Sequence, residues 1–242
     1  MRRFNPALKD LQERVCEANH QLHRSGLVPL TWGNVSEREA FEDSYVVGIK
    51  PSGVPYERIR PRDIVVLKPT GQIVAGSLRP SSDTPTHLYL YSELPHWNGI
   101  THTHSTFATA WAQTGRDIPI LGTTHADYFP RSIPCTSSMI EQEVTDQYET
   151  ETGRKIVMKL REVSASDSPM VLVHGHGAFT FGNSGDSSVD AAIALEAIAQ
   201  IATLCLAIHP VTKEIPQYLI DRHYSRKHGP NSYYGQVTTQ LS

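Results

Sequence analysis

Two pairs of histidines, each with one residue between its members, constrain this chain more than any other pattern in it. The first pair is HTH at 102–104, and the second, HGH at 174–176, follows about seventy residues later. Each pair lies beside an apolar run typical of a strand, where side chains two positions apart share a face about 6–7 Å from each other. One such pair is commonly a polar stretch of a half-buried strand. Two pairs favour three imidazoles around one divalent cation, with a position left open for catalysis.

Helices that alternate with short strands predict an α/β fold. Apolar residues recur at helical spacing from residue 6, after an Asn-Pro start, to a glycine stop at residue 26. Further helices are predicted over 84–94, 105–114, 186–208 and 215–228. Strands are predicted over 45–50, 63–68, 72–75, 170–174 and 178–181, and before the first histidine pair. The stretch 141–161 has a mixed pattern that predicts neither a helix nor a strand. Hairpin-like strand pairs indicate a central mixed, mostly antiparallel sheet in one catalytic domain, 1–236, followed by a frayed tail, 237–242.

Composition excludes several classes of protein. The 242 residues are 39% hydrophobic and 19% charged, which is ordinary for a globular protein. A formal net charge of −3 gives no reason to expect nucleic acid or an anionic membrane as a partner. Three widely spaced cysteines without a Cys-x-x-Cys pattern suit a reducing cytoplasm. The apolar stretch 189–208 is interrupted by Glu196 and Gln200, which favours a buried core helix over a membrane span.

Six motifs occur in a fixed order along nearly the whole chain. They are TWGNVS at 31–36, IKPSGV at 49–54, PSSDTPTH at 80–87, HTHS at 102–105, GTTHADYF at 122–129 and YYGQ at 233–236. As an ordered set, these motifs resemble those of the L-ribulose-5-phosphate 4-epimerases, in the class II aldolase superfamily, from about residue 8 to residue 236. The resemblance implies a layered α/β fold whose central sheet is covered by helices.

The same resemblance implies a metal centre. It assigns the metal ligands and their acidic neighbour to four residues: Asp83, His102, His104 and His176. His174 is the rival of His176, and spacing alone leaves the choice between them open. We expect Zn²⁺ at three neutral nitrogens, with Mn²⁺ or Co²⁺ as possible substitutes.

Three features of the sequence qualify this assignment. Asp83 precedes a predicted helix that begins at Thr84-Pro85, so its alternative role is that of an N-cap, and both roles can hold together. Gly175 stands where the family often has serine, and this difference can alter the geometry of His176. The stretch 39–44 also differs from the family in length and composition.

A phosphate site is implied on the loops around the metal. It comprises Asn34, Lys50, Ser52, Gly53, Ser81 and Ser82. Hydroxyls, a side-chain amide and backbone N–H groups near turns can hold a dianion, and Lys50 adds a positive charge. Any one of these segments alone is more often an ordinary loop.

Proton transfer is assigned by the resemblance to Asp127 and Tyr234. Tyr233 is the alternative if the chain end is shifted by one residue; without the resemblance, this tyrosine pair reads as a packing or interface contact. In the family both groups reach the metal from a neighbouring subunit of a ring-shaped homotetramer. Four further residues accompany them: Thr123, Glu149, His223 and Arg226. Glu149 lies in a charged stretch for which a solvated helix face is the ordinary explanation.

The implied activity is the interconversion of two phosphorylated ketopentoses, L-ribulose 5-phosphate and D-xylulose 5-phosphate. The inverted carbon is not adjacent to a carbonyl, so its hydrogen is not appreciably acidic. The chain has no Gly-x-Gly-x-x-Gly motif for a nicotinamide, which favours retro-aldol cleavage and re-addition over transient oxidation. The alternatives are a class II sugar-phosphate aldolase that releases its fragments, an enzyme acting on a different ketopentose phosphate, and an adducin-like scaffold. A scaffold has no need of the three histidines.

Overall fold

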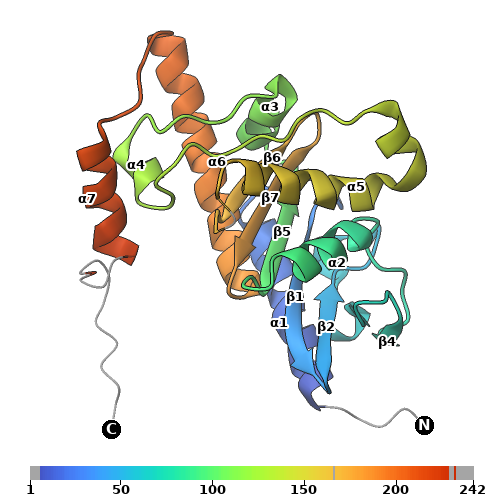
Figure 1. The fold of residues 1–242 in the computed structure, drawn as a ribbon. Coiled ribbons are helices and arrows are strands. Elements are labelled where there is room, and N and C mark those ends of the chain that lie inside the picture. The colour runs from blue at the N-terminus through green and yellow to red at the C-terminus, as the bar shows by residue number, and fades with distance from the viewer. Residues whose placement is uncertain (1–5, 166, 229–231, 233–242) are drawn as a thin grey trace, which may run out of the picture.

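A seven-stranded sheet with strand order β4-β3-β2-β1-β5-β7-β6 forms the centre of the molecule (Figure 1). The structure is a computed structural model, and it describes residues 6–165, 167–228 and 232. The strands are β1 Asn34–Phe41, β2 Ser44–Ile49, β3 Val65–Leu67, β4 Ile73–Ala75, β5 Gly99–Thr103, β6 Met170–Val173 and β7 Gly177–Gly182. All six pairings between these strands are antiparallel, and an isolated parallel bridge joins Cys135 to Leu172. The prediction of a mostly antiparallel sheet is confirmed.

Helices cover both faces of this sheet. They are α1 Pro6–Arg24, α2 Thr84–Glu93, α3 Thr106–Thr114, α4 Thr123–Ala126, α5 Glu141–Glu162, α6 Gly185–Ile208 and α7 Gln217–His228, with 3-10 turns at Tyr56–Arg58 and Pro61–Asp63. Neighbouring residues of a strand point to opposite faces. On β2, Val46 therefore packs in a core with α1, whereas Val47 packs with α2 and α5. On β6, Leu172 packs with α3 and α6, whereas Val171 faces α5. The result is a layered fold with two helical covers.

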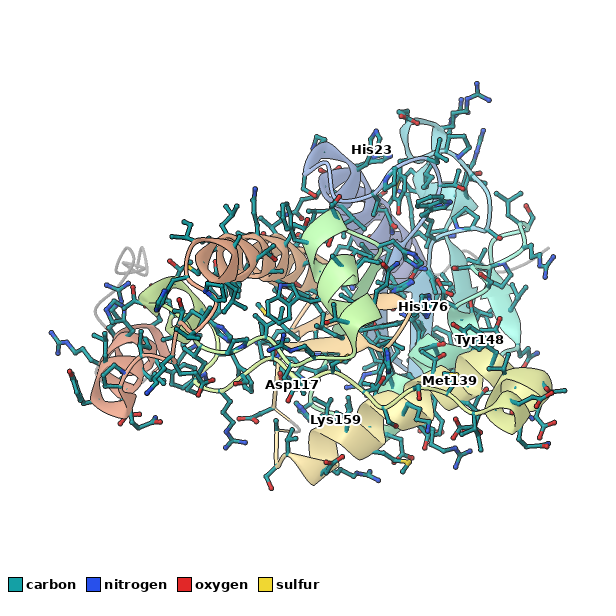
Figure 2. All side chains as sticks on the ribbon, turned by 90° about the horizontal axis from the view of Figure 1, so that it is seen from above. His23, Asp117, Met139, Tyr148, Lys159 and His176 are labelled. Carbon is teal, nitrogen blue, oxygen red and sulfur yellow. The ribbon has the colours of Figure 1, made fainter. Side chains whose placement is uncertain are left out.

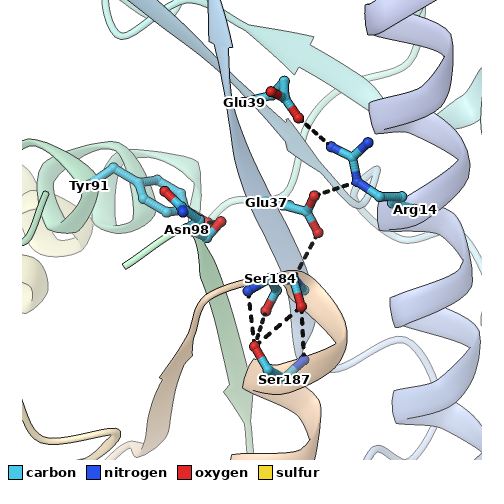
Figure 3. Close-up of polar contacts among 8 residues, drawn as sticks. Arg14, Glu37, Glu39, Tyr91, Asn98, Ser184 and Ser187 are labelled. Carbon is cyan, nitrogen blue, oxygen red and sulfur yellow. Dashed lines mark hydrogen bonds and ion pairs between the residues drawn. The ribbon is translucent and has the colours of Figure 1, made fainter. Parts of the chain in front are cut away.

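Strand β1 was not among the sequence-predicted strands, because charged residues occupy its middle. Glu37 is only 6% exposed, and its carboxylate accepts hydrogen bonds from Arg14 Nε at 2.6 Å and from the Gly185 backbone N–H at 2.8 Å. The second contact lies at the N-terminus of α6, where a negative charge is favourable. Arg14 also reaches Glu39 at 2.6 Å (Figure 3). Contacts distant in sequence thus link α1, β1 and α6 and make this charged strand possible.

Helix α6 departs from the prediction of a buried core helix. Its inner face packs on β5, β7 and α3, but three apolar side chains near its C-terminal end are exposed: Ile201 at 44%, Leu204 at 51% and Ile208 at 84%. Among the described residues, α6 is also the helix whose length and apolar character would suffice to cross a bilayer. The burial prediction therefore holds for the inner face of the helix and is wrong, within one chain, for its outer face, where Ile193 is also 40% exposed.

Candidate active site

One end of the central sheet gathers four of the six sequence motifs and the second histidine pair. Strand β1 begins there, β5 ends there and β7 begins there, because the three neighbouring strands are antiparallel. The register places Asn34 opposite His102, and Phe179 opposite His102 on the other side. A pocket of about 470 Å³ opens at this end. It is lined by Thr31, Trp32, Gly33, Asn34, Lys50, Pro51, Ser52, Gly53, Ser81, Ser82, Asp83, His102, His104 and His176.

The three histidines assigned as metal ligands lie together in this pocket. One ring nitrogen from each of His102, His104 and His176 lies within 4.8 Å of the other two, and the Nε2 atoms of His102 and His104 are 3.0 Å apart. Burial lowers the pKa of His104 and of His176 to about 4, with a further contribution from the neighbouring rings. Both rings are therefore neutral near pH 7, as metal ligands must be. Three imidazoles at this separation fit a divalent transition metal with an open coordination position.

The second histidine pair divides between two environments. His176 enters the cluster, whereas the His174 ring lies against Gly115, where an added Cβ would come within 2.8 Å of its Cε1 atom. Gly175, between them, has a φ of +73° in the loop that joins β6 to β7. Glycine adopts this left-handed conformation without steric cost, so the departure from serine suits the tight loop. The structure thus brings together His176, not His174, and the first pair.

Asp83 turns its carboxylate into the same pocket. It occupies the N-cap position of α2, but its side chain makes no capping hydrogen bond, so the N-cap role holds by position only. Its Oδ2 atom instead accepts a hydrogen bond from Asn34 Nδ2 at 2.6 Å. Burial raises the Asp83 pKa, but the charge effect of the His102 ring and the Asn34 hydrogen bond outweigh it, so the pKa lies below its ordinary value. The carboxylate is therefore ionised beside the histidines.

All six residues of the expected phosphate site line the pocket. The Lys50 side chain is 2% exposed, and its ammonium lies 4.6 Å from the centre of the Tyr56 ring. Burial lowers the Lys50 pKa to about 8, with Asp83 partly offsetting the shift. A buried cation beside hydroxyl groups is a suitable receptor for a phosphate dianion.

Two backbone N–H groups of this site are already hydrogen-bonded within the protein. The Ser52 N–H donates to the Arg79 carbonyl at 2.9 Å, and the Ser81 N–H donates to the Lys50 carbonyl at 3.0 Å. The two loops bridge each other at Pro51 and Pro80, which uses these amides internally. At Ser52 and Ser81, the hydroxyls are the groups left for an anion.

Asp127 forms a second cluster, at the contact between α4 and α7. Its carboxylate accepts hydrogen bonds from His223 Nδ1 at 3.0 Å and from Arg226 Nε at 2.9 Å. Partial burial raises the Asp127 pKa, but these contacts and the charge of Lys227 outweigh it, so the pKa is below its ordinary value. Figures 1 and 2 show α4 and α7 side by side. They lie on one side of α6, whereas α2 and α5 lie on the other.

The other expected interface residues are dispersed. Thr123 begins α4, close to Asp127, and its carbonyl accepts the Asp127 backbone N–H at 2.9 Å. Glu149 lies on α5, where its carbonyl accepts a hydrogen bond from Thr86 Oγ1 at 2.6 Å. Tyr234 and its alternative Tyr233 lie outside the described residues, as does the stretch 237–242. Within the described part of the chain, the pocket lining contains neither Asp127 nor its partners on α7.

Sequence reasoning missed Pro51, which lines the pocket between Lys50 and Ser52, and four further residues of this region. Thr31, Trp32 and Gly33 line the pocket, and all belong to the motif from which only Asn34 was selected. The Trp32 ring lies 6.2 Å from the His104 ring, at a tilt of 49°. Tyr148, in the stretch that had no assigned element, has its hydroxyl 3.1 Å from His176 Nδ1. The first three were recoverable from their motif, whereas no local pattern marked Tyr148.

Gly33 packs closely on the His102 backbone because it has no side chain. It has a φ of +72°, and a Cβ at this position would lie 2.6 Å from the His102 carbonyl oxygen. Gly33→Ala should lower the free energy of unfolding by more than the roughly 1–2 kcal/mol of a left-handed alanine, because the clash adds to it. Gly71→Ala is a matched control, since Gly71 has a φ of +83° and no atom within 4 Å of its Cβ position. Thermal unfolding of both variants checks this, and equal losses would mean that the clash is relieved at no cost.

Comparisons with known proteins agree with this geometry. Residues 13–203 match the family described as "Class II Aldolase and Adducin N-terminal domain". The chain is 47% identical over 229 residues to L-ribulose-5-phosphate 4-epimerase UlaF of Salmonella paratyphi C (strain RKS4594), covering 95% of this chain and 100% of that protein. The corresponding protein of Salmonella typhi gives the same identity and coverage.

Solved structures show the same fold at lower sequence identity. An L-fuculose 1-phosphate aldolase superposes with a TM-score of 0.74 at 21% identity, covering 90% of this chain and 95% of that one. The L-fuculose 1-phosphate aldolase from Glaciozyma antarctica PI12 gives a TM-score of 0.72 at 18% identity, covering 90% and 81%. These two structural similarities establish the fold. The 47% identity to an L-ribulose-5-phosphate 4-epimerase identifies the group within the family. The chain belongs to the class II aldolase family and, within it, to the L-ribulose-5-phosphate 4-epimerases.

Proposed function

We propose that this protein interconverts L-ribulose 5-phosphate and D-xylulose 5-phosphate by cleaving and re-forming the C3–C4 bond. The observation that carries the proposal is the pocket itself, where three clustered histidines face a buried lysine and serine hydroxyls at one end of the sheet. A zinc ion bound by His102, His104 and His176 would supply Lewis-acid stabilisation of the negative charge that develops on oxygen during cleavage. Asp83, ionised beside them, adds to the charge that attracts a cation.

The chain's own residues account for substrate binding. The Lys50 ammonium, the Asn34 amide and the hydroxyls of Ser52, Ser81 and Ser82 face one volume and would hold the phosphate. Anchoring that group fixes the end of the sugar that leaves as glycolaldehyde phosphate. The other fragment, the enediolate of dihydroxyacetone, must then stay in the pocket while the aldehyde turns its opposite face toward it.

We assign the proton transfers to Asp127 and Tyr234, acting from a neighbouring subunit. Cleavage requires removal of the C4 hydroxyl proton, and re-addition on the other face requires a donor on the opposite side. Asp127 is held ionised by Arg226 and His223, which suits a base. Because this cluster lies away from the pocket of its own chain, a second subunit would have to supply it.

A cyclic homotetramer is the assembly that we propose for this sharing. The exposed apolar residues of α6, together with Val211 at 70% exposure, give the chain apolar surface that a neighbouring subunit could cover. A head-to-tail interface closed into a ring would place one composite site at each boundary.

The cysteines Cys16, Cys135 and Cys205 are free, which supports a reducing, cytoplasmic location.

Product analysis separates epimerisation from aldol cleavage. Metal-loaded protein incubated with L-ribulose 5-phosphate should yield D-xylulose 5-phosphate, with free dihydroxyacetone and glycolaldehyde phosphate only in traces. Starting from those two free fragments, we expect slow formation of ketopentose phosphate, far below the rate of epimerisation. Chromatography of the products over time checks both expectations. Accumulation of free fragments as main products would establish the aldolase alternative instead.

A further inference from the structure

Tyr148 reaches the metal centre from outside the pocket. Its hydroxyl lies 3.1 Å from Nδ1 of His176, and the two rings are 6.0 Å apart (Figure 2). The residue belongs to α5, which otherwise packs on α2 and β6, and it does not line the pocket. Tyr148 therefore contacts a proposed ligand without contacting the space that substrate would occupy.

The backbone of α5 is shaped to place this side chain. Gln147, immediately before it, has a φ of −147° and a ψ of 63°, which interrupts the helix. After the interruption, the Glu149 carbonyl accepts a hydrogen bond from Thr86 Oγ1 of α2 at 2.6 Å. The Tyr148 carbonyl accepts one from Thr152 Oγ1 at 2.9 Å. The kink and these two bonds fix the point from which the tyrosine extends toward His176.

The contact decides which nitrogen of His176 is available. A neutral imidazole carries its proton on one nitrogen and a lone pair on the other. If Nδ1–H donates to the Tyr148 hydroxyl, Nε2 keeps the lone pair that a metal requires. His102 shows the same arrangement, since its Nδ1 lies 3.0 Å from the Ala178 carbonyl oxygen while its Nε2 faces His104. Outer contacts of this kind orient metal-binding histidines and typically contribute 10–100-fold to metal affinity.

We infer that Tyr148 is a positioning residue, whose hydroxyl accepts the Nδ1 proton of His176 and so directs Nε2 into the metal site. The inference rests on the proposed metal-dependent function and adds to it a residue that acts only through His176. The His102 partner is a backbone carbonyl and cannot be removed by substitution. Among the described contacts of the three histidines, the Tyr148 hydroxyl is a side-chain contact. A single substitution can therefore isolate its contribution to metal affinity.

Tyr148→Phe removes the hydroxyl and keeps the ring. We expect Zn²⁺ affinity, measured by competition with a chromogenic chelator, to fall about 10–100-fold. The visible spectrum of the Co²⁺-loaded variant should change, because the His176 ring is less constrained. Turnover at saturating metal should stay within a few-fold of wild type, since the hydroxyl does not touch substrate. Tyr89→Phe is the matched control, because Tyr89 lies in the same α2–α5 contact, under Arg154, and should leave affinity and spectrum unchanged.

The outcomes are distinguishable. Unchanged Zn²⁺ affinity in Tyr148→Phe, with a normal thermal unfolding curve, would overturn the inference. A loss of turnover at saturating metal without a loss of affinity would overturn it as well, because it would place the hydroxyl in the chemistry. An equal loss of affinity in Tyr89→Phe would assign the effect to the packing of α2 on α5. Wild-type protein that binds no Zn²⁺ in the same titration would refute the proposed metal centre itself, independently of Tyr148.

Discussion

His104→Asn should leave a folded protein that retains little metal and turns over substrate at least about a thousandfold more slowly. The ring of His104 is one of three imidazoles whose nitrogens lie within 4.8 Å of each other, so its loss leaves two protein nitrogens for the ion. Lewis-acid stabilisation supplies several kcal/mol of the barrier reduction in such enzymes. Elemental analysis of the purified variant, together with circular dichroism, separates loss of metal from loss of fold.

His174→Asn is the matched control for this substitution. It removes a histidine from the β6–β7 hairpin, which also carries His176, but the His174 ring lies against Gly115 and outside the cluster. Metal content and activity should remain close to wild type. Full activity in protein shown to be metal-free would refute the retro-aldol mechanism. A larger metal loss in His174→Asn than in His176→Asn would mean that the hairpin presents its other histidine to the ion.

Two inactive variants should recover activity when their subunits are mixed. Asp127→Asn removes the carboxylate held by His223 and Arg226, and should lower turnover about 10²–10⁴-fold while leaving metal content unchanged. His104→Asn removes the metal half. If each site combines the pocket of one chain with the α4–α7 cluster of its neighbour, random mixing leaves about a quarter of the boundaries with two intact halves. Co-refolded mixtures should therefore reach about a quarter of wild-type activity.

A second mixture provides the control for this experiment. Asp127→Asn and His223→Asn affect the same cluster, because the two side chains are hydrogen-bonded within one chain. No boundary in their hybrids contains an intact cluster, so this mixture should not exceed its parents. Native mass spectrometry establishes that hybrids have formed in both cases. Hybrids of the first pair that stay inactive would show that each site is built within a single chain.

The sequence was informative where chemistry and periodicity are local. The histidine spacing predicted a common site, and that site depends only on strands β5 and β7 being neighbours. Helices α1 and α2 and strands β2 and β6 also followed from apolar patterns of the expected period. The patterns that predict these helices and strands need no information from distant parts of the chain.

The parts that the sequence did not predict depend on distant partners. Strand β1 buries Glu37 because Arg14 and the start of α6 neutralise it, and nothing within the strand indicates either partner. The choice of His176 follows from the shape of a hairpin loop, not from spacing. Tyr148 was hidden for the same reason, since a backbone interruption at Gln147 directs it to a ring that is distant in sequence.

The burial of Lys50 has a consequence for the stability of the ligand-free protein. Its pKa is lowered from 10.5 to about 8, so the unfolded chain binds a proton more tightly than the folded one. Below pH 8 the buried ammonium therefore opposes folding, and this opposition is relieved as the pH rises from about 8 to 10.5. A phosphate dianion would relieve it at neutral pH by pairing with the charge. Lys50→Met should accordingly unfold at a higher temperature in neutral buffer yet bind phosphate poorly. Binding sites often carry such a loss of stability in return for ligand affinity.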